Sequence, residues 1–148
     1  MKQTAWAHLP NAKHIDWVLA SAKAHPEKWP AARAAARDAV WTAARTAAYN
    51  AVWDAARYNA WYAAYNAASD AAYYAAFDAA KGTILALIAW DDCAYMIESE
   101  VDEIKILAKL GDQRATLLLP ACSVYNETKS ITPLISYISK IKKCLFSI

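Results

Sequence analysis

The chain has 148 residues, is 58% hydrophobic with only two glycines, and carries a formal net charge of +2 at pH 7. This length supports one domain with its own core, and the scarcity of glycine beside abundant alanine excludes a β-sandwich or barrel. The charge is unevenly distributed, with an acidic segment at 83–112 between two mildly basic ones, which argues against a general nucleic-acid coat protein with its continuous basic surface.

The first predicted helix lies within the N-terminal 30 residues. It begins at Asn11, a capping residue type, and runs to about His25. Ile15 and Val18 have the spacing of one apolar helix face, and Pro26 ends the segment.

An internal repeat occupies residues 31–82, where alanine pairs recur every four positions. A longer period overlies it, because DAVWTAAR at 38–45 returns twelve residues later as NAVWDAAR at 50–57. No glycine or proline falls between Pro30, which suits a first helical turn, and Gly82, which suits a helix end. Because alanine is the strongest helix former, the repeat is predicted to be helical.

The four-residue spacing does not match the turn of an α-helix. Each residue turns the helix by about 100°, so the alanine stripe advances by about 40° per repeat and winds around the axis. A single helix of about fifty residues would be about 75 Å long and would show its aromatic residues on every side. Either several helices enclose it or, as we favour, it breaks into shorter helices, with candidate breaks at Asn50, Asn59, Asn66 or Ser69-Asp70.

Predicted helices follow the repeat. An apolar run at 83–90 comes first, and Ser99 with Asp102 forms a capping box for a helix that ends near Gly111. Asp112 can cap the next helix, which we expect to stop at the following proline.

The remaining predicted helices lie in the C-terminal part of the chain. The helix after Asp112 should cover 113–119 and be interrupted at Pro120, and a last amphipathic helix should start at Thr132-Pro133 and close the core. We therefore predict an all-α, compact bundle of about six to eight helices, with close packing through alanine. Its single domain, 1–148, comprises an N-terminal helix (1–30), the repeat (31–82) and C-terminal helices (83–148).

The absence of certain sequence features limits the cellular location and the partners that we expect. No apolar stretch approaches the ~20 residues of a membrane span, no secretory signal is visible, and the three cysteines, Cys93, Cys122 and Cys144, are an odd number. We expect a protein of a reducing cytoplasm, without a membrane span. The acidic segment 83–112 between two mildly basic ones leaves room for one small anionic ligand, and a homo-oligomer stays open.

The sequence of residues 31–122 resembles known proteins, which implies a biological context. The AAxx tetrads interleaved with Trp, Tyr, Arg and Asp, followed by ALIAWDDCAYMIESEVDEIKILAKLGDQRATLLLPAC at 86–122, resemble a class of alanine-rich proteins of bacteriophage and prophage genomes. They are more loosely similar to alanine-rich immunity proteins of bacterial toxin loci. The resemblance covers residues 31–122 and implies conflict between phage and bacterium, in the cytoplasm of the infected or lysogenic host, and no particular reaction.

Enzyme motifs and metal signatures are missing from the sequence. HExxH, CxxC, GxSxG and a Gly-rich phosphate loop do not occur, and His8, His14 and His25 do not share helical spacing. We expect no metal and no cofactor.

Neighbouring carboxylates are the one acidic candidate. Asp91 and Asp92 with Glu98 could bind a metal for hydrolysis, but adjacent residues point to different sides of a helix, so solvated charges at a helix end are the favoured interpretation. If one of the two aspartates is instead buried, it needs a cation, and Arg45 or Arg57 is the candidate partner.

Aromatic residues and arginines at four-residue steps are the strongest candidate site. Trp and Tyr rings stack on bases and Arg pairs with phosphate, which is the chemistry of a nucleotide pocket, although such stripes more often form a core with snorkelling arginines. The candidate ligand-binding residues are Arg37, Trp41, Arg45, Trp53, Arg57, Trp61, Tyr65 and Asp92.

Three functions are consistent with these features. The leading hypothesis is a non-enzymatic phage protein that counters host defence by sequestering a nucleotide-like immune signal. The second is an inhibitor that binds a host defence protein through an aromatic surface, since Trp, Tyr and Arg are hot-spot residues. A metal-dependent hydrolase that uses Asp91 and Asp92 is the third.

Overall fold

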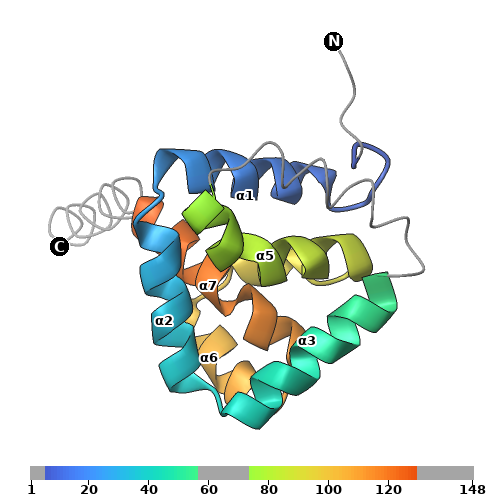
Figure 1. Ribbon diagram of the computed structural model, residues 1–148, viewed down its shortest axis with the longest axis vertical. Helices are drawn as coiled ribbons and strands as arrows, with labels where there is room; N and C mark the ends of the chain where they lie inside the picture. The colour runs from blue at the N-terminus through green and yellow to red at the C-terminus, as the bar shows by residue number, and fades with distance from the viewer. Residues whose placement is uncertain (1–5, 57–73, 130–148) are drawn as a thin grey trace, which may run out of the picture.

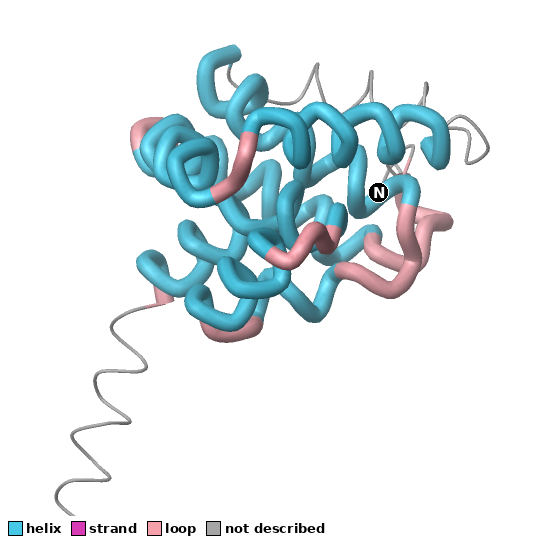
Figure 2. Tube along the Cα trace, turned by 90° about the horizontal axis from the view of Figure 1, so that it is seen from below, coloured by secondary structure: helices cyan, strands magenta, loops and turns pink. Residues whose placement is uncertain are grey.

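The computed structural model describes residues 6–56 and 74–129. These residues form six α-helices and one 3₁₀ helix, and no strand occurs among them (Figure 1 and Figure 2). The elements are α1 (Ala12–Ala24), α2 (Lys28–Ala39), α3 (Thr42–Ala56), α5 (Tyr74–Ala89), η1 (Ala94–Glu98), α6 (Val101–Lys109) and α7 (Gln113–Thr128). The predicted all-α, compact multi-helix bundle is confirmed. Within the described ranges, no helix combines the length and the apolar character that a membrane crossing requires.

Two helices, α5 and α7, form the centre of the bundle. The run 84–88 in α5 and the run 117–122 in α7 are buried on every side. A helix that is apolar all round must be enclosed by others. Accordingly α1, α2, α3 and α7 pack on α5, while α2, α3, α6 and η1 pack on α7, and Figure 1 shows α2 and α3 meeting at a corner in front of this pair.

The alanine repeat breaks between α2 and α3, as the mismatch of periods predicts, but at an unexpected place. Val40 is extended, with φ −128° and ψ 137°, and is buried, while the next residue, Trp41, is exposed. Asn50, a predicted break point, lies inside α3, so that prediction is wrong. The other candidates, at 59, 66 and 69–70, lie outside the described residues.

In two of the alanine pairs, one in α2 and one in α3, one alanine points into the core and the other outward. Ala36 and Ala48 are buried, whereas their partners Ala35 and Ala47 are exposed. Along α3 the inward positions continue to Val52, four residues after Ala48. The small inward side chain places the helix backbone close to its neighbours, which is the alanine-mediated packing expected from the sequence.

Gly82 does not end a helix, contrary to the prediction. It lies inside α5, where a Cβ atom would come within 3.0 Å of Oη of Tyr49 and 3.2 Å of Cδ2 of Leu117. Glycine suits this position because a Cβ atom would make Tyr49 of α3 and Leu117 of α7 shift by a few tenths of an ångström.

Pro120 likewise does not interrupt its helix, since α7 runs continuously from Gln113 to Thr128. A proline inside a helix removes one amide donor and is tolerated where surrounding contacts hold the helix. Such contacts are present, because Pro120 is buried and Oγ1 of Thr83 donates a hydrogen bond of 2.9 Å to the carbonyl of Leu117.

Helix caps agree with the sequence in part. Oδ1 of Asp112 accepts a hydrogen bond of 3.1 Å from the amide of Ala115, which confirms the predicted cap of α7. The predicted capping box before α6 is wrong, because Oγ of Ser99 donates to the carbonyl of Tyr95 and α6 has no side-chain cap. Gly111, with φ 95°, ends the α6 segment as expected.

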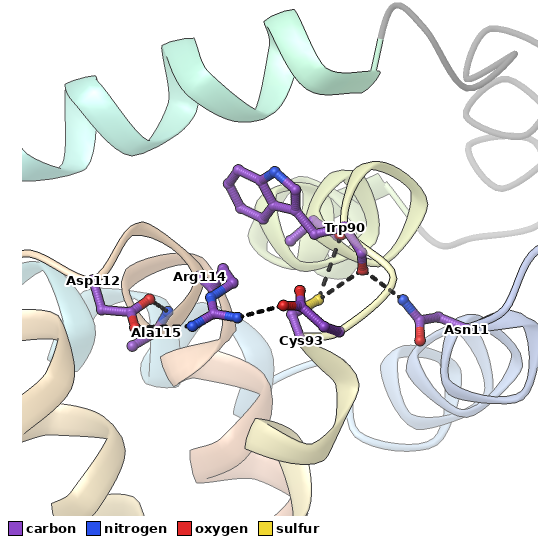
Figure 3. A network of polar contacts seen from close by, with 8 residues as sticks. Asn11, Trp90, Cys93, Asp112, Arg114 and Ala115 are labelled. Atoms are coloured by element: carbon purple, nitrogen blue, oxygen red, sulfur yellow. Dashed lines mark hydrogen bonds and ion pairs between the residues drawn. The ribbon is translucent and has the colours of Figure 1, made fainter.

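Asn11 caps a different helix from the one that follows it. It occupies the N-cap position of α1, yet its buried Nδ2 donates to the carbonyls of Leu87, at 3.0 Å, and of Trp90, at 2.8 Å (Figure 3). These carbonyls belong to the C-terminal end of α5, which lacks further helical donors. Asn11 therefore ties the start of α1 to the end of the central helix.

We predict that Asn11→Ala lowers the free energy of unfolding by about 1–3 kcal/mol, because it removes the amide donor from the buried carbonyl of Leu87 and leaves the carbonyl of Trp90 with the weak thiol donor of Cys93 alone. Urea denaturation followed by circular dichroism measures the change. Asn50→Ala, which removes an exposed amide from α3, should stay within about 0.5 kcal/mol of the unmodified chain. Equal stability of the two variants would remove the capping role.

Two thiols are buried in the core. Burial, together with the nearby charge of Asp92, raises the pKa of Cys93 to about 12, and burial raises that of Cys122 to about 11. Cys93 Sγ lies 3.3 Å from the carbonyl of Trp90, and Cys122 Sγ lies 3.2 Å from that of Ser99. The thiolate is the reactive form, so both groups should be inert in the folded state.

In a Cys144→Ser chain at about pH 9, we expect iodoacetamide to modify Cys93 and Cys122 no faster than the protein opens, because the folded thiols stay protonated while an unfolded thiol, of pKa about 8.5, is largely ionised. Mass spectrometry after timed quenching gives the rates, with the same chain in urea as the control. Modification of the folded chain at the rate seen in urea would contradict the burial.

Candidate functional site

A cavity of about 240 Å³ lies where α2, α3, α5 and α7 converge. Arg33 and Arg37 enter it from α2, and Arg45 enters from α3. Gly82 of α5 and Pro120 of α7 are among the residues that line it on the inner side. We call this space the arginine cavity.

The break after α2 creates the arginine cavity. Arg33 and Arg37 are four residues apart, so they share one face of α2. In an unbroken helix Arg37 and Arg45 would be about 12 Å apart along the axis and rotated by about 80°. Because the chain bends at Val40, one face of α3 turns toward α2 and the two arginines line the same cavity.

The three guanidinium groups differ in their partners. Arg33 is paired, since its Nη1 lies 2.9 Å from Oδ2 of Asp78. Arg45 is half engaged: Nη2 donates to Oγ1 of Thr42 at 3.0 Å, while Nε is buried and has no hydrogen-bond partner among the described residues. Arg37 is exposed and makes no ion pair or hydrogen bond in the part of the chain that the structure describes. Positive charge therefore exceeds negative charge around the cavity.

The hydroxyl groups of the lining are mostly committed to the protein. Thr46, Thr83 and Thr116 donate to the carbonyls of Thr42, Leu117 and Asp112, at 3.0, 2.9 and 2.9 Å respectively. Tyr49 is different, because its hydroxyl makes no hydrogen bond within residues 6–56 and 74–129. Its O–H group is available to a bound molecule.

The structure brings two of the predicted site residues together, Arg37 and Arg45. Trp41 lies between them in the sequence but is 83% exposed and does not line the cavity. Trp53 is half-buried against the core, and Nζ of Lys81 lies 5.4 Å from the centre of its ring. The remaining three, Arg57, Trp61 and Tyr65, lie outside the described residues.

Sequence reasoning missed two residues of the arginine cavity, Arg33 and Tyr49. The four-residue spacing could have found both, since Arg33 precedes Arg37 by four and Tyr49 follows Arg45 by four. Residues four apart lie on the same face of a helix, so the spacing identifies both positions once α2 and α3 are treated as two separate helices.

Asp92 does not belong to this site. It is exposed in the turn after α5, and its Oδ2 lies 2.9 Å from Nη1 of Arg114 (Figure 3). The alternative of a buried aspartate paired with Arg45 is wrong, because Asp91 and Asp92 are both exposed and Asp92 forms its ion pair with Arg114 of α7. Glu98 pairs instead with His14, at 3.5 Å. No group of three His, Cys, Asp or Glu side chains within the described ranges could hold a metal ion.

A second hollow, of about 220 Å³, lies between α1, η1 and α7. Trp17 and Tyr125 line it, with ring centres 5.6 Å apart in an edge-to-face arrangement. Lys13 and Glu98 also line it, so opposite charges offset one another there. The arginine cavity is therefore the better anion site of the two.

The arginine cavity has the chemistry to bind a small anion that also carries an apolar part. Guanidinium groups pair with phosphate or carboxylate through two parallel hydrogen bonds, and Leu117 and Pro120 offer an apolar surface. Comparison with known protein families, with curated proteins and with solved structures gives no match.

Proposed function

We propose that the protein is a non-enzymatic binding protein that sequesters a small nucleotide-like anion in the arginine cavity. The observation that carries this proposal is the convergence of Arg33, Arg37 and Arg45 on one cavity. The buried Nε of Arg45 strengthens it, because a buried donor without a partner destabilises a protein by about 1–3 kcal/mol and a phosphate oxygen would satisfy it.

The lining favours binding over catalysis. General acid–base and nucleophilic chemistry rely mostly on His, Asp, Glu, Lys or Cys. None of these types is among the described residues that line the cavity, where Tyr49 has the one phenolic hydroxyl and the threonines have alcohol hydroxyls. Three cations and an apolar floor suit a molecule that is held and not converted.

The resemblance of residues 31–122 to phage proteins supplies a biological role for such binding. A phage protein that holds a nucleotide signal lowers its free concentration, which deprives the host defence of its trigger. Sequestration requires only affinity and abundance, in keeping with a site that contains binding groups alone.

An inhibitor of a host protein is the second candidate function, and one observation favours it. Four large apolar side chains are exposed among the described residues: Trp41 at 83%, Leu110 at 79%, and Tyr95 and Ile106 at 58% each. Exposed Trp and Tyr side chains are frequent hot spots of protein interfaces. This function would use the outer surface and leave the arginine cavity without a role.

Isothermal titration calorimetry on the full chain tests the leading proposal, with inorganic phosphate, AMP, cyclic nucleotides and ADP-ribose-type nucleotides as probes. We expect Arg45→Ala and Arg37→Ala each to weaken nucleotide binding by about 10- to 100-fold, the usual effect of one charge-assisted hydrogen bond. Arg114→Ala is the matched control, because that arginine pairs with Asp92 outside the cavity. A folded chain that binds none of the probes would remove the proposal.

A substitution at Trp41 distinguishes the two candidate functions. Trp41→Ala should leave nucleotide affinity unchanged, since this side chain does not line the cavity, but it should abolish capture of a host protein if the exposed aromatic surface is an interface. Calorimetry and a pull-down from host lysate provide the two readouts. Capture that depends on Trp41, in a chain that binds no nucleotide, would favour the inhibitor.

A further inference from the structure

The arginine cavity has a charged rim and a buried floor. Arg37 is exposed, and Arg33 and Arg45 are half-buried, with Nε of Arg45 itself buried. The α5 and α7 residues of the lining are all buried: Ala79, Gly82, Thr83, Thr116, Leu117 and Pro120. A ligand that fills the cavity therefore has its anionic group outermost and a neutral part inside.

Pro120 gives the floor a hydrogen-bond acceptor. Proline has no amide hydrogen, so the carbonyl four residues earlier, that of Thr116, loses its helical donor. No described side chain donates to this carbonyl, whereas the next one, that of Leu117, receives a hydrogen bond from Thr83. Thr116 and Pro120 both line the cavity. The acceptor that the proline frees is thus on a residue of the cavity floor.

Tyr49 adds a second polar group near the floor. Its hydroxyl oxygen lies 3.0 Å from the position that a Cβ atom would take on Gly82, and it has no hydrogen-bond partner in the described part of the chain. Gly82 therefore makes room for the phenol ring to lie across α5. Besides the hydroxyls of Thr83 and Thr116, which already donate to carbonyls, the inner part of a ligand would meet the Thr116 carbonyl and the Tyr49 hydroxyl.

The volume limits the ligand to one nucleotide unit. At about 240 Å³ the cavity is smaller than the ~300–1,000 Å³ of most pockets for drug-sized molecules. One base with its sugar is of a suitable size for such a space, and a second nucleotide would lie outside.

We infer that the ligand is a single nucleoside monophosphate unit whose base carries an amino group, bound with the base inside and the phosphate at the arginine rim. This inference rests on the proposed function. The amino group would donate to the Thr116 carbonyl, Tyr49 would bond a ring nitrogen or a sugar hydroxyl, and Arg37 and Arg45 would hold the phosphate.

Calorimetry with three matched probes tests the orientation: AMP, purine riboside 5′-monophosphate, which lacks the amino group, and ribose 5-phosphate. We expect AMP to bind about ten-fold more tightly than the purine analogue, because the analogue leaves the carbonyl acceptor unpaired. In Pro120→Ala, the restored amide hydrogen occupies that carbonyl, so the ratio of the two affinities should fall to about one. Pro26→Ala, in the turn before α2, should keep the ten-fold ratio.

A second variant covers the case in which Pro120→Ala disturbs α7, which circular dichroism would reveal. Tyr49→Phe keeps the ring and removes the hydroxyl, so AMP should bind several-fold more weakly while ribose 5-phosphate loses less than two-fold. Equal binding of AMP, the purine analogue and ribose 5-phosphate would overturn the inference and leave a simple anion site. A dinucleotide that binds more than ten-fold more tightly than AMP would also overturn it. Absence of binding by every probe, inorganic phosphate included, would remove the proposed function itself.

Discussion

The structure depends on a mismatch between a motif repeated every four residues and a helix that turns every 3.6. In one continuous helix the inward alanines Ala36 and Ala48 would face directions about 120° apart, so only one could meet the core. The bend at Val40 resets the direction, and both alanines become buried. The same bend sets Arg37 opposite Arg45, so the packing of the repeat and the arginine cavity have one physical cause.

The central helices contain residues that usually end helices. Gly82 lies inside α5 and Pro120 inside α7, and both line the arginine cavity. Contacts with neighbouring helices keep α5 and α7 helical although glycine and proline destabilise a helix locally. Gly82 allows Tyr49 to approach the α5 backbone, and Pro120 leaves a carbonyl of α7 without its helical donor. Positions where local preference is overruled by packing are often functional, and here two of them meet at one site.

Local chemistry predicts much of this fold and less of the site. Helix propensity predicts the helical conformation of the alanine-rich segments and of the first helix, and a capping rule predicts the cap at Asp112. Both rules act within a few residues. The break at Val40 has only a weak local signal, because valine favours extended backbone but Val52, at the equivalent position of the repeat, lies inside α3. Burial of Val40 against other helices accompanies the break. Arg37 and Arg45 could be found from the four-residue spacing. Trp41 has the same spacing but is exposed, because the chain bends at the residue before it.

The distribution of counter-charges separates a binding site from a solvated arginine surface. Arg114 lies beside Asp92 and Arg33 beside Asp78, as expected of arginines that stabilise a helical surface. Arg37 and Arg45 have no carboxylate within reach among the described residues, although they lie at one cavity where their like charges repel. Alanine at either position would fit the repeat and relieve that repulsion. Under the proposed function, these two arginines, one of them with a buried Nε that has no partner among the described residues, are the groups that a bound anion would satisfy.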